Sequence, residues 1–204
     1  MPWCCVYAGI ADLYGLAGHG NATGDEVKKL DVIANDIMVN MLTNSQVCCV
    51  LVSEEEEEPI IVQEAHRGRF AVAFDPLDGS SNIDCNVSTG TIFAVWNCNA
   101  EDVTRAPLDC ILRSGNEIVC AGYCMYGSAT ELVLTYGHGV MKYTLDPSLG
   151  EFIHTQSEVR IPSQPKMIYS VNEGNYSTWD ENMQRAVDGF KFNEPKPHSA
   201  RYVG

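Results

Sequence analysis

The chain has 204 residues, of which 27 are Asp or Glu and only 13 are Lys or Arg, giving a formal charge of −14. This length suffices for one full domain and the start of a second. The acidic balance excludes a cationic nucleic-acid-binding protein, and no apolar run is long enough to cross a membrane. The acidity instead favours cation binding.

Nine cysteines are scattered through mainly apolar segments. The first seven residues lack the basic region of a secretory signal. We therefore expect reduced thiols in the core of a cytoplasmic protein. Cys98 and Cys110 flank a polar stretch, so a redox pair is the less favoured alternative.

The first predicted element is a mobile loop over residues 19–29, which contains Asp25. From Val27 to about Leu42, apolar residues recur at three- and four-residue steps, which predicts an amphipathic helix. Asp31 lies near the start of that helix. Asp25 and Asp31 are as compatible with roles as turn and cap residues as with roles in a site.

A strand predicted over residues 47–52 leads into a run of five glutamates over residues 54–58. We interpret residues 56–58 as a solvated loop. Glu54 and Glu55 stand at the strand end, where ligands gather in α/β folds. A metal-binding or water-activating role and a solvated loop explain these two residues equally well.

A second apolar run over residues 70–74 predicts a strand that leads into the sequence Asp-Pro-Leu-Asp-Gly-Ser over residues 75–80. Asp75 and Asp78 offer hard oxygen ligands on a turn stiffened by Pro76, which suits Mg²⁺ or Mn²⁺. The glycine and hydroxyl groups that follow suit an oxyanion such as phosphate. A self-capped surface turn explains an isolated motif of this kind equally well.

Several features are predicted for the rest of the chain. Further strands are expected over residues 60–63, 90–96, 117–126, 131–136 and 140–145, with a polar loop over 97–116. Prolines and polar residues indicate a boundary near residue 160. Beyond it we expect a strand over 167–171 and a helix over 180–189.

These motifs resemble the fructose-1,6-bisphosphatase family, in the family's order and near its spacing. The most specific block is Phe-Asp-Pro-Leu-Asp-Gly-Ser-Ser-Asn-Ile-Asp at residues 74–84. The other blocks are residues 24–31, 51–55, 121–123, 145–147, 172–174 and 201–204. Inositol monophosphatases share only the Asp-Pro-x-Asp-Gly core, and sedoheptulose-1,7-bisphosphatases are the nearest alternative.

The resemblance implies an α/β fold with mixed sheets and helices between the layers. It implies an N-terminal domain over residues 8–160 and the start of a C-terminal sugar-phosphate domain over 161–204. The family's N-terminal regulatory helices and most of its C-terminal domain have no counterpart in the sequence, so we expect a fragment. Family members are homo-oligomers, which implies a tetramer.

The resemblance also implies hydrolysis of the 1-phosphate of fructose 1,6-bisphosphate with two or three Mg²⁺ or Mn²⁺ ions in each site. The metal ligands would be Glu54, Asp75, Asp78 and the backbone carbonyl of Leu77. Asp31 and Glu55 would orient or deprotonate the attacking water, and Asp25 would join them when its loop closes.

Substrate contacts follow from the same resemblance. Gly79, Ser80 and Ser81 would hold the 1-phosphate, while Asn172, Tyr176 and Tyr202 would lie at the 6-phosphate. Arg201 would reach the 6-phosphate site of a neighbouring subunit. An alternative hypothesis from a different functional class is that the chain is a catalytically silent fragment that acts only by binding to an oligomer.

Overall fold

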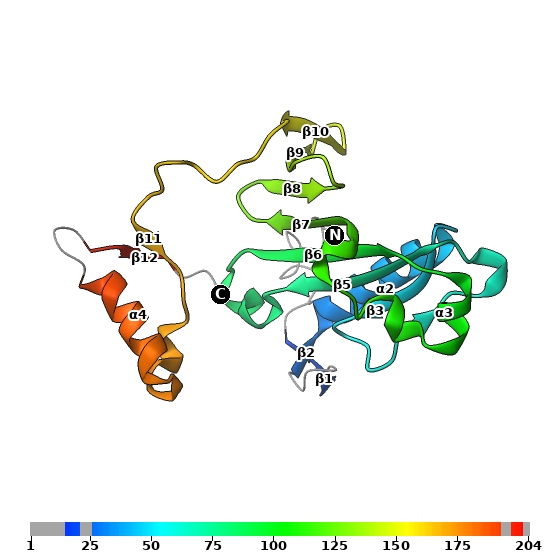
Figure 1. Ribbon diagram of the computed structural model, residues 1–204, viewed down its shortest axis with the longest axis horizontal. Coiled ribbons are helices and arrows are strands. Elements are labelled where there is room, and N and C mark those ends of the chain that lie inside the picture. Colours follow the sequence, from blue (N-terminus) through cyan, green and yellow to red (C-terminus); the bar gives the residue numbers. More distant parts are fainter. Residues whose placement is uncertain (1–14, 21–25, 193–196, 202–204) are drawn as a thin grey trace. The chain divides into compact units, whose positions relative to one another are not determined.

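The computed structural model describes residues 15–20, 26–192 and 197–201. The chain forms two compact units, Met1–Val159 and Arg160–Gly204. Figure 1 follows the described elements of each unit along the chain. None of the described helices is long and apolar enough to cross a membrane.

An eight-stranded sheet dominates the first unit (Figure 1). Its strand order is β10-β9-β8-β7-β6-β5-β3-β4, with β3 and β5 parallel and all other neighbours antiparallel. The strands are β3 (Cys48–Ser53), β4 (Ile60–Ile61), β5 (Phe70–Asp78), β6 (Thr89–Asn97), β7 (Ile118–Tyr126), β8 (Thr130–Thr135), β9 (Met141–Asp146) and β10 (Glu151–Gln156). This mixed sheet with its helices confirms the predicted α/β class.

Helix α2 (Lys29–Asn44) covers one face of the sheet (Figure 1). Its apolar positions recur every three or four residues, so they form one stripe. The residues Met38, Val39 and Leu42 of this stripe pack against Cys48, Leu51, Val72 and Phe74 of β3 and β5. The start of α2 lies beside the end of β5, where Leu30 and Ala34 pack with Leu77.

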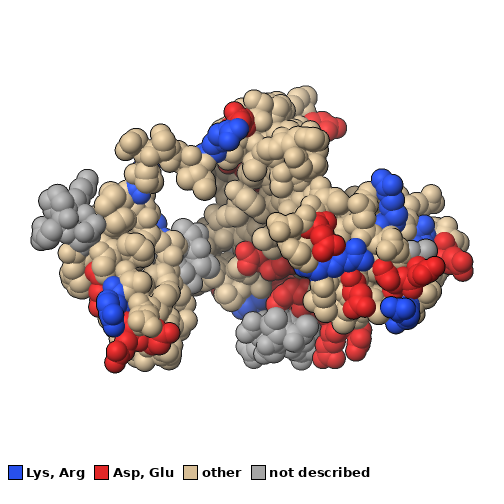
Figure 2. Space-filling view, viewed as in Figure 1, with Lys and Arg blue, Asp and Glu red and all other residues tan. Residues whose placement is uncertain are grey.

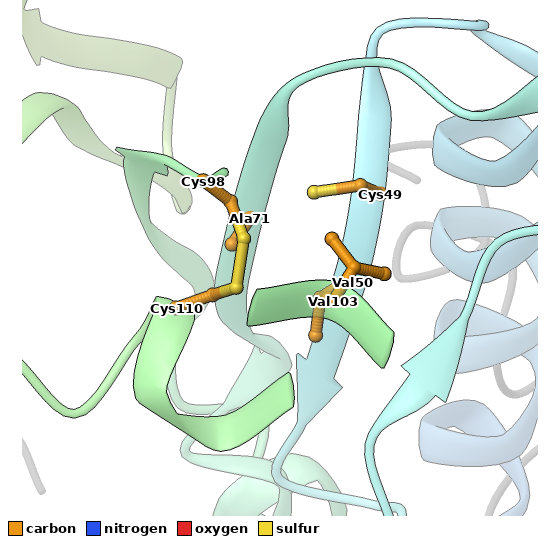
Figure 3. Close-up of a cluster of buried hydrophobic side chains, with 6 residues drawn as sticks. All are labelled: Cys49, Val50, Ala71, Cys98, Val103 and Cys110. Carbon is orange, nitrogen blue, oxygen red and sulfur yellow. A yellow bond between two sulfur atoms is a disulfide. The ribbon is translucent and has the colours of Figure 1, made fainter. Parts of the chain in front are cut away.

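The opposite face of β3 and β5 carries a second core cluster, which Figure 3 shows. Its members are Cys49, Val50, Ala71, Cys98, Val103 and Cys110. Val103 comes from helix α3 (Ala100–Arg105), and Cys110 ends the 3₁₀ helix η3 (Pro107–Cys110). The two helices therefore cover this end of the sheet from the side opposite to α2.

This cluster corrects two predictions. The segment 97–116 is not a plain loop, because α3, η3 and η4 (Gly115–Glu117) lie within it. These elements are short and bury few apolar residues, so the sequence carries little helical periodicity. The prediction of reduced thiols is wrong for Cys98 and Cys110, which form a disulfide across a Cα–Cα distance of 5.2 Å.

A third correction concerns the predicted loop over residues 19–29. The described part of it contains the end of β1 (Leu16–Gly20) and β2 (Glu26–Lys28), which pair antiparallel. Both strands are short, β1 contains two glycines, and their pairing register shifts, so no clean alternation marks them in the sequence. Asp25 lies outside the described residues.

The second unit contains β11 (Ile168–Tyr169), η5 (Glu173–Thr178), α4 (Glu181–Lys191) and β12 (Ser199–Ala200). β11 and β12 pair in parallel. Helix α4 begins with the Asp180 side chain, which accepts hydrogen bonds from the N–H groups of Asn182 and Met183. β12 and β10 were not predicted, because both are exposed and have no buried face to impose an alternating pattern.

Gly68 generates a prediction about stability. A Cβ at this position would lie 2.2 Å from the backbone carbonyl carbon and oxygen of Val47. Gly68→Ala should therefore cost roughly 2–3 kcal/mol of unfolding free energy, because backbone at that distance must shift. Gly115, which has open space around its Cα, provides the control. Thermal unfolding should show a large loss for Gly68→Ala and almost none for Gly115→Ala, and equal losses would contradict this packing.

Candidate active site

Five carboxylates from three elements gather at one end of the parallel strand pair. Asp31 lies in the first turn of α2, Glu54 and Glu55 follow β3, and Asp75 and Asp78 belong to the end of β5. Burial raises the pKa of Asp31, Glu55 and Asp75, and mutual repulsion among these charges adds to the rise. The structure therefore brings together the acids that the sequence singled out on separate elements.

Asp31 serves the helix and the cluster at once. Its Oδ2 accepts a hydrogen bond of 2.8 Å from the Lys28 N–H at the start of α2, which is the capping role considered above. Its Oδ1 is buried without a hydrogen-bond partner. Burial raises the pKa of Asp31, and the Lys28 N–H and the Ser80 hydroxyl only partly oppose this rise. The second oxygen is therefore available to a group that the protein itself does not supply.

Among these acids, Glu55 has a strongly raised pKa. Burial, followed by the charges of Asp31 and Glu54, raises its pKa to about 8. Its Oε2 is also buried without a hydrogen-bond partner. A carboxylate with such a high pKa is a strong base once it is ionised, which suits a group that takes a proton from water.

The loop after β3 is held by a residue that the sequence analysis missed. Asn35 lies one turn after Asp31 on α2 and is 6 % exposed. Its Oδ1 accepts a bond of 2.7 Å from the Ser53 hydroxyl, and its Nδ2 donates over 2.6 Å to Glu56. Glu56 is thus tied to α2 rather than merely solvated. The four-residue spacing from Asp31 is the sequence signal that could have identified Asn35.

Asp75 lies within β5 rather than on a surface turn after it, which corrects the predicted strand end. Its Oδ1 accepts a hydrogen bond of 2.9 Å from the Leu77 N–H, as in a self-capped turn. Pro76 and Leu77 are nevertheless buried, so the surface-turn alternative does not hold. Burial raises the pKa of Asp75 to about 6; the Leu77 N–H opposes this rise, while the charges of Asp78 and Glu54 add to it.

The segment after Asp78 forms a compact polar turn. Gly79 has φ of 82°, a conformation that favours glycine, and the 3₁₀ helix η2 (Ser80–Cys85) follows directly. Lys28 at the end of β2 forms an ion pair of 2.8 Å with Asp84 of η2. The turn that carries Ser80 and Ser81 is therefore anchored to the segment that enters α2.

Three of the predicted 6-phosphate residues lie in the second unit. The Asn172 side chain accepts a bond from the Gly174 N–H and caps η5. The Tyr176 hydroxyl donates to Asp188 over 2.8 Å, and the Lys191 ammonium lies 4.9 Å from the centre of the Tyr176 ring. Arg201 is exposed, and its guanidinium donates to the Ala200 carbonyl. Tyr202 lies outside the described residues.

The donor set suits a hard divalent cation. Among the described residues no group of three His, Cys, Asp or Glu side chains is arranged to hold a metal ion by itself. However, Asp31 and Glu55 each have a buried oxygen without a partner, and burial, followed by repulsion from neighbouring acids, raises the pKa of both groups. Carboxylate oxygens are the ligands that Mg²⁺ and Mn²⁺ prefer, so a cation would relieve this repulsion.

A groove of about 650 Å³ begins beside Glu54 and Asp75 and continues over Ala73, Ile92 and Tyr123 of the sheet. Its lining is mainly apolar, which does not suit the hydroxyls and phosphates of a sugar bisphosphate. Figure 2 shows acidic side chains over the lower part of the first unit, whereas the part that carries β8–β10 is mainly tan. The charged cluster, and not the groove, is the candidate site for phosphate chemistry.

Comparison with known proteins identifies the family. Residues 5–157 match the model of the fructose-1,6-bisphosphatase N-terminal domain. The chain belongs to the fructose-1,6-bisphosphatase family. It is 53% identical over 201 residues to a cytosolic fructose-1,6-bisphosphatase of Oryza coarctata, and 51% identical over 199 residues to that of Spinacia oleracea.

These family relatives are longer than this chain. The alignments cover 97% of the chain but only 57% and 58% of the Oryza coarctata and Spinacia oleracea proteins. The Leishmania major fructose-1,6-bisphosphatase in its holo form matches with a TM-score of 0.92 and 45% identity. That match covers the whole chain and 63% of the Leishmania chain.

The raised pKa values generate a prediction about pH. Glu55 has a pKa of about 8 in the folded protein against an ordinary value of 4.5, so the folded state holds its proton more tightly. This carboxyl therefore stabilises the fold below about pH 4.5, and the contribution is lost as the pH rises through about 8. Without divalent ions, thermal stability should fall from about pH 5 to about pH 9, and Glu55→Gln should flatten that fall.

The control for this measurement is Glu57→Gln, which neutralises an exposed glutamate of the same acidic run. It should leave the pH dependence of the unfolding temperature nearly unchanged. Equal slopes for the wild type and Glu55→Gln would show that burial of Glu55 does not govern the pH dependence.

Proposed function

We propose that this chain carries the metal and 1-phosphate site of a phosphatase that converts fructose 1,6-bisphosphate to fructose 6-phosphate and phosphate. The observation that supports this most directly is the gathering of Asp31, Glu54, Glu55, Asp75 and Asp78 beside the polar turn in a member of this family. Hydrolysis of a phosphate monoester is extremely slow without a catalyst. Neutralising and positioning charge is therefore the main task of such a site.

Glu54, Asp75, Asp78 and the Leu77 carbonyl would hold two or three Mg²⁺ or Mn²⁺ ions. Bound there, the ions would neutralise the phosphate and lower the pKa of a coordinated water. The Pro76–Leu77 backbone supports this role because it is buried and holds Asp75 through the Leu77 N–H. The carboxylates are thus partly ordered before any ion arrives.

Glu55 and Asp31 would orient the attacking water and take its proton. Their unpartnered oxygens and raised pKa values support this assignment. Ser80, Ser81 and the N–H groups after Gly79 would hold the 1-phosphate, while Asp25 would approach from the preceding segment. The water oxygen bonds to phosphorus as the ester bond breaks, and the sugar alkoxide takes up a proton.

Asn172, Tyr176 and Tyr202 would contribute to the 6-phosphate site, and Arg201 would reach that site in a neighbouring subunit of a homo-oligomer, a tetramer in this proposal. The Tyr176 hydroxyl donates its single proton to Asp188, whose charge repels an anion. This bond would have to break before Tyr176 could donate to the 6-phosphate. The domain limits proposed are 8–160 and 161–204. A cytoplasmic location is proposed because the relatives are named cytosolic.

Substitution of Asp75 tests the proposal. Asp75→Asn should reduce phosphate release from fructose 1,6-bisphosphate by about 10²-fold or more, since a lost charge contact in the transition state commonly has that effect. Glu58→Gln, an exposed change in the acidic run, is the control. Activity is measured with Mg²⁺ or Mn²⁺ in the 204-residue chain and in a chain extended by the matching segment of the Oryza coarctata relative.

Parallel assays with sedoheptulose 1,7-bisphosphate and inositol monophosphate separate the alternative substrates. The fructose ester should be hydrolysed fastest. Faster turnover of either alternative would reassign the substrate. Absence of turnover in both proteins, together with stable binding to a full-length relative, would instead favour the silent oligomer-binding reading.

A further inference from the structure

The end of β5 contains a β-bulge at the acidic turn. Asp75 pairs with Ile92 of β6 and Asp78 pairs with Gly90, so Pro76 and Leu77 together face the single residue Thr91. A bulge interrupts the ladder and leaves backbone groups without their usual partners. Pro76 has no N–H, and its carbonyl is buried at a position where the regular pairing is lost.

The Thr91 side chain replaces the missing backbone bond. Its hydroxyl donates to the Pro76 carbonyl oxygen over 2.8 Å in a buried contact. The same hydroxyl oxygen lies 2.5 Å from the Tyr126 hydroxyl of β7. A carbonyl oxygen only accepts, so the single Thr91 proton is committed to Pro76 and Tyr126 must be the donor to Thr91.

The result is a relay of two hydrogen bonds, Tyr126 to Thr91 to the Pro76 carbonyl, which crosses three adjacent strands. It reaches the peptide unit between Pro76 and Leu77 from the carbonyl side. The N–H of the same peptide unit donates to Asp75 over 2.9 Å. The unit is therefore held at both ends, and its orientation sets both the Asp75 carboxylate and the Leu77 backbone.

The Tyr126 ring is itself fixed by packing. It lies against the cluster of Leu30, Ala34, Leu77 and Ile83, which joins α2, the acidic turn and η2. A phenol packed in this way presents its hydroxyl from a defined position. The relay thus starts from a rigid part of the core and not from a surface side chain.

We propose that Thr91 and Tyr126 are positioning residues for the cation site, which they serve by fixing the Pro76–Leu77 peptide through this relay. The inference rests on the proposed function, because it assigns the metal-binding role to Asp75 and Leu77. Groups that hold metal ligands from behind typically change metal affinity about 10–100-fold when they are removed. Thr91 and Tyr126 are not among the proposed metal ligands or substrate contacts.

The test is Mn²⁺ binding to the 204-residue chain, measured by calorimetry and by the electron paramagnetic resonance signal of free Mn²⁺. Thr91→Val, which keeps the shape but removes the hydroxyl, should weaken Mn²⁺ binding by about tenfold or more. Tyr126→Phe should weaken it less, because the Thr91–Pro76 bond remains. The double variant should bind no more weakly than Thr91→Val, and Thr91→Ser should restore most of the affinity.

Thr144→Val is the matched control, since it removes a strand hydroxyl that contacts Thr155 on the β9–β10 hairpin. It should bind Mn²⁺ like the wild type. If Thr91→Val does not fold, as judged by circular dichroism, Tyr126→Phe decides the question. Wild-type affinity in the folded relay variants would overturn the inference and leave the proposed metal site standing. A wild-type chain that fails to bind Mn²⁺ would overturn both.

Discussion

Repulsion among carboxylates at the ends of β3 and β5 is the constraint around which the first unit is arranged. Charges of one sign separate unless packing holds their backbones together. Here α2 packs on the strands through Met38, Val39 and Leu42, and α3 packs on the opposite face through Val103. Hydrophobic burial on both faces thus holds the two strands, and the packing of Leu30 and Ala34 with Leu77 holds the acidic end of β5 beside α2.

The polar groups around the acids complete this arrangement. Asn35 ties α2 to Ser53 and Glu56, Lys28 pairs with Asp84, and the Leu77 N–H holds Asp75. Each of these groups restrains one segment of the site. None of these four contacts involves the two buried oxygens of Asp31 and Glu55 that have no partner. The site therefore combines a rigid surround with unsatisfied charge at its centre, which is the condition for electrostatic preorganisation.

The sequence predicted the elements in which apolar residues recur at regular spacing, together with the acids at the ends of these elements. The strand pattern of residues 70–74 and the helical stripe after Val27 both arise from burial, which leaves a local signal. The Thr91–Pro76 contact has no such signal, and the Cys98–Cys110 pair was only the less favoured alternative, because each depends on how separate segments fold together. The bulge at Pro76 was equally hidden, since it is a property of the β5–β6 register and not of either strand alone.

Burial of the strands decreases across the sheet from β3 to the edge strand β10. Most residues of β3 are buried, whereas all six residues of β10 are exposed. Native-state amide hydrogen exchange reports local opening, whose free energy depends on how many packed contacts each segment would lose. Exchange should therefore begin at β10 and proceed inward strand by strand, and the amides of β3 and β5 should exchange only when the whole unit unfolds. The acidic turn lies on the protected side of this gradient, so fluctuations of the outer hairpin can occur without disturbing the ligands.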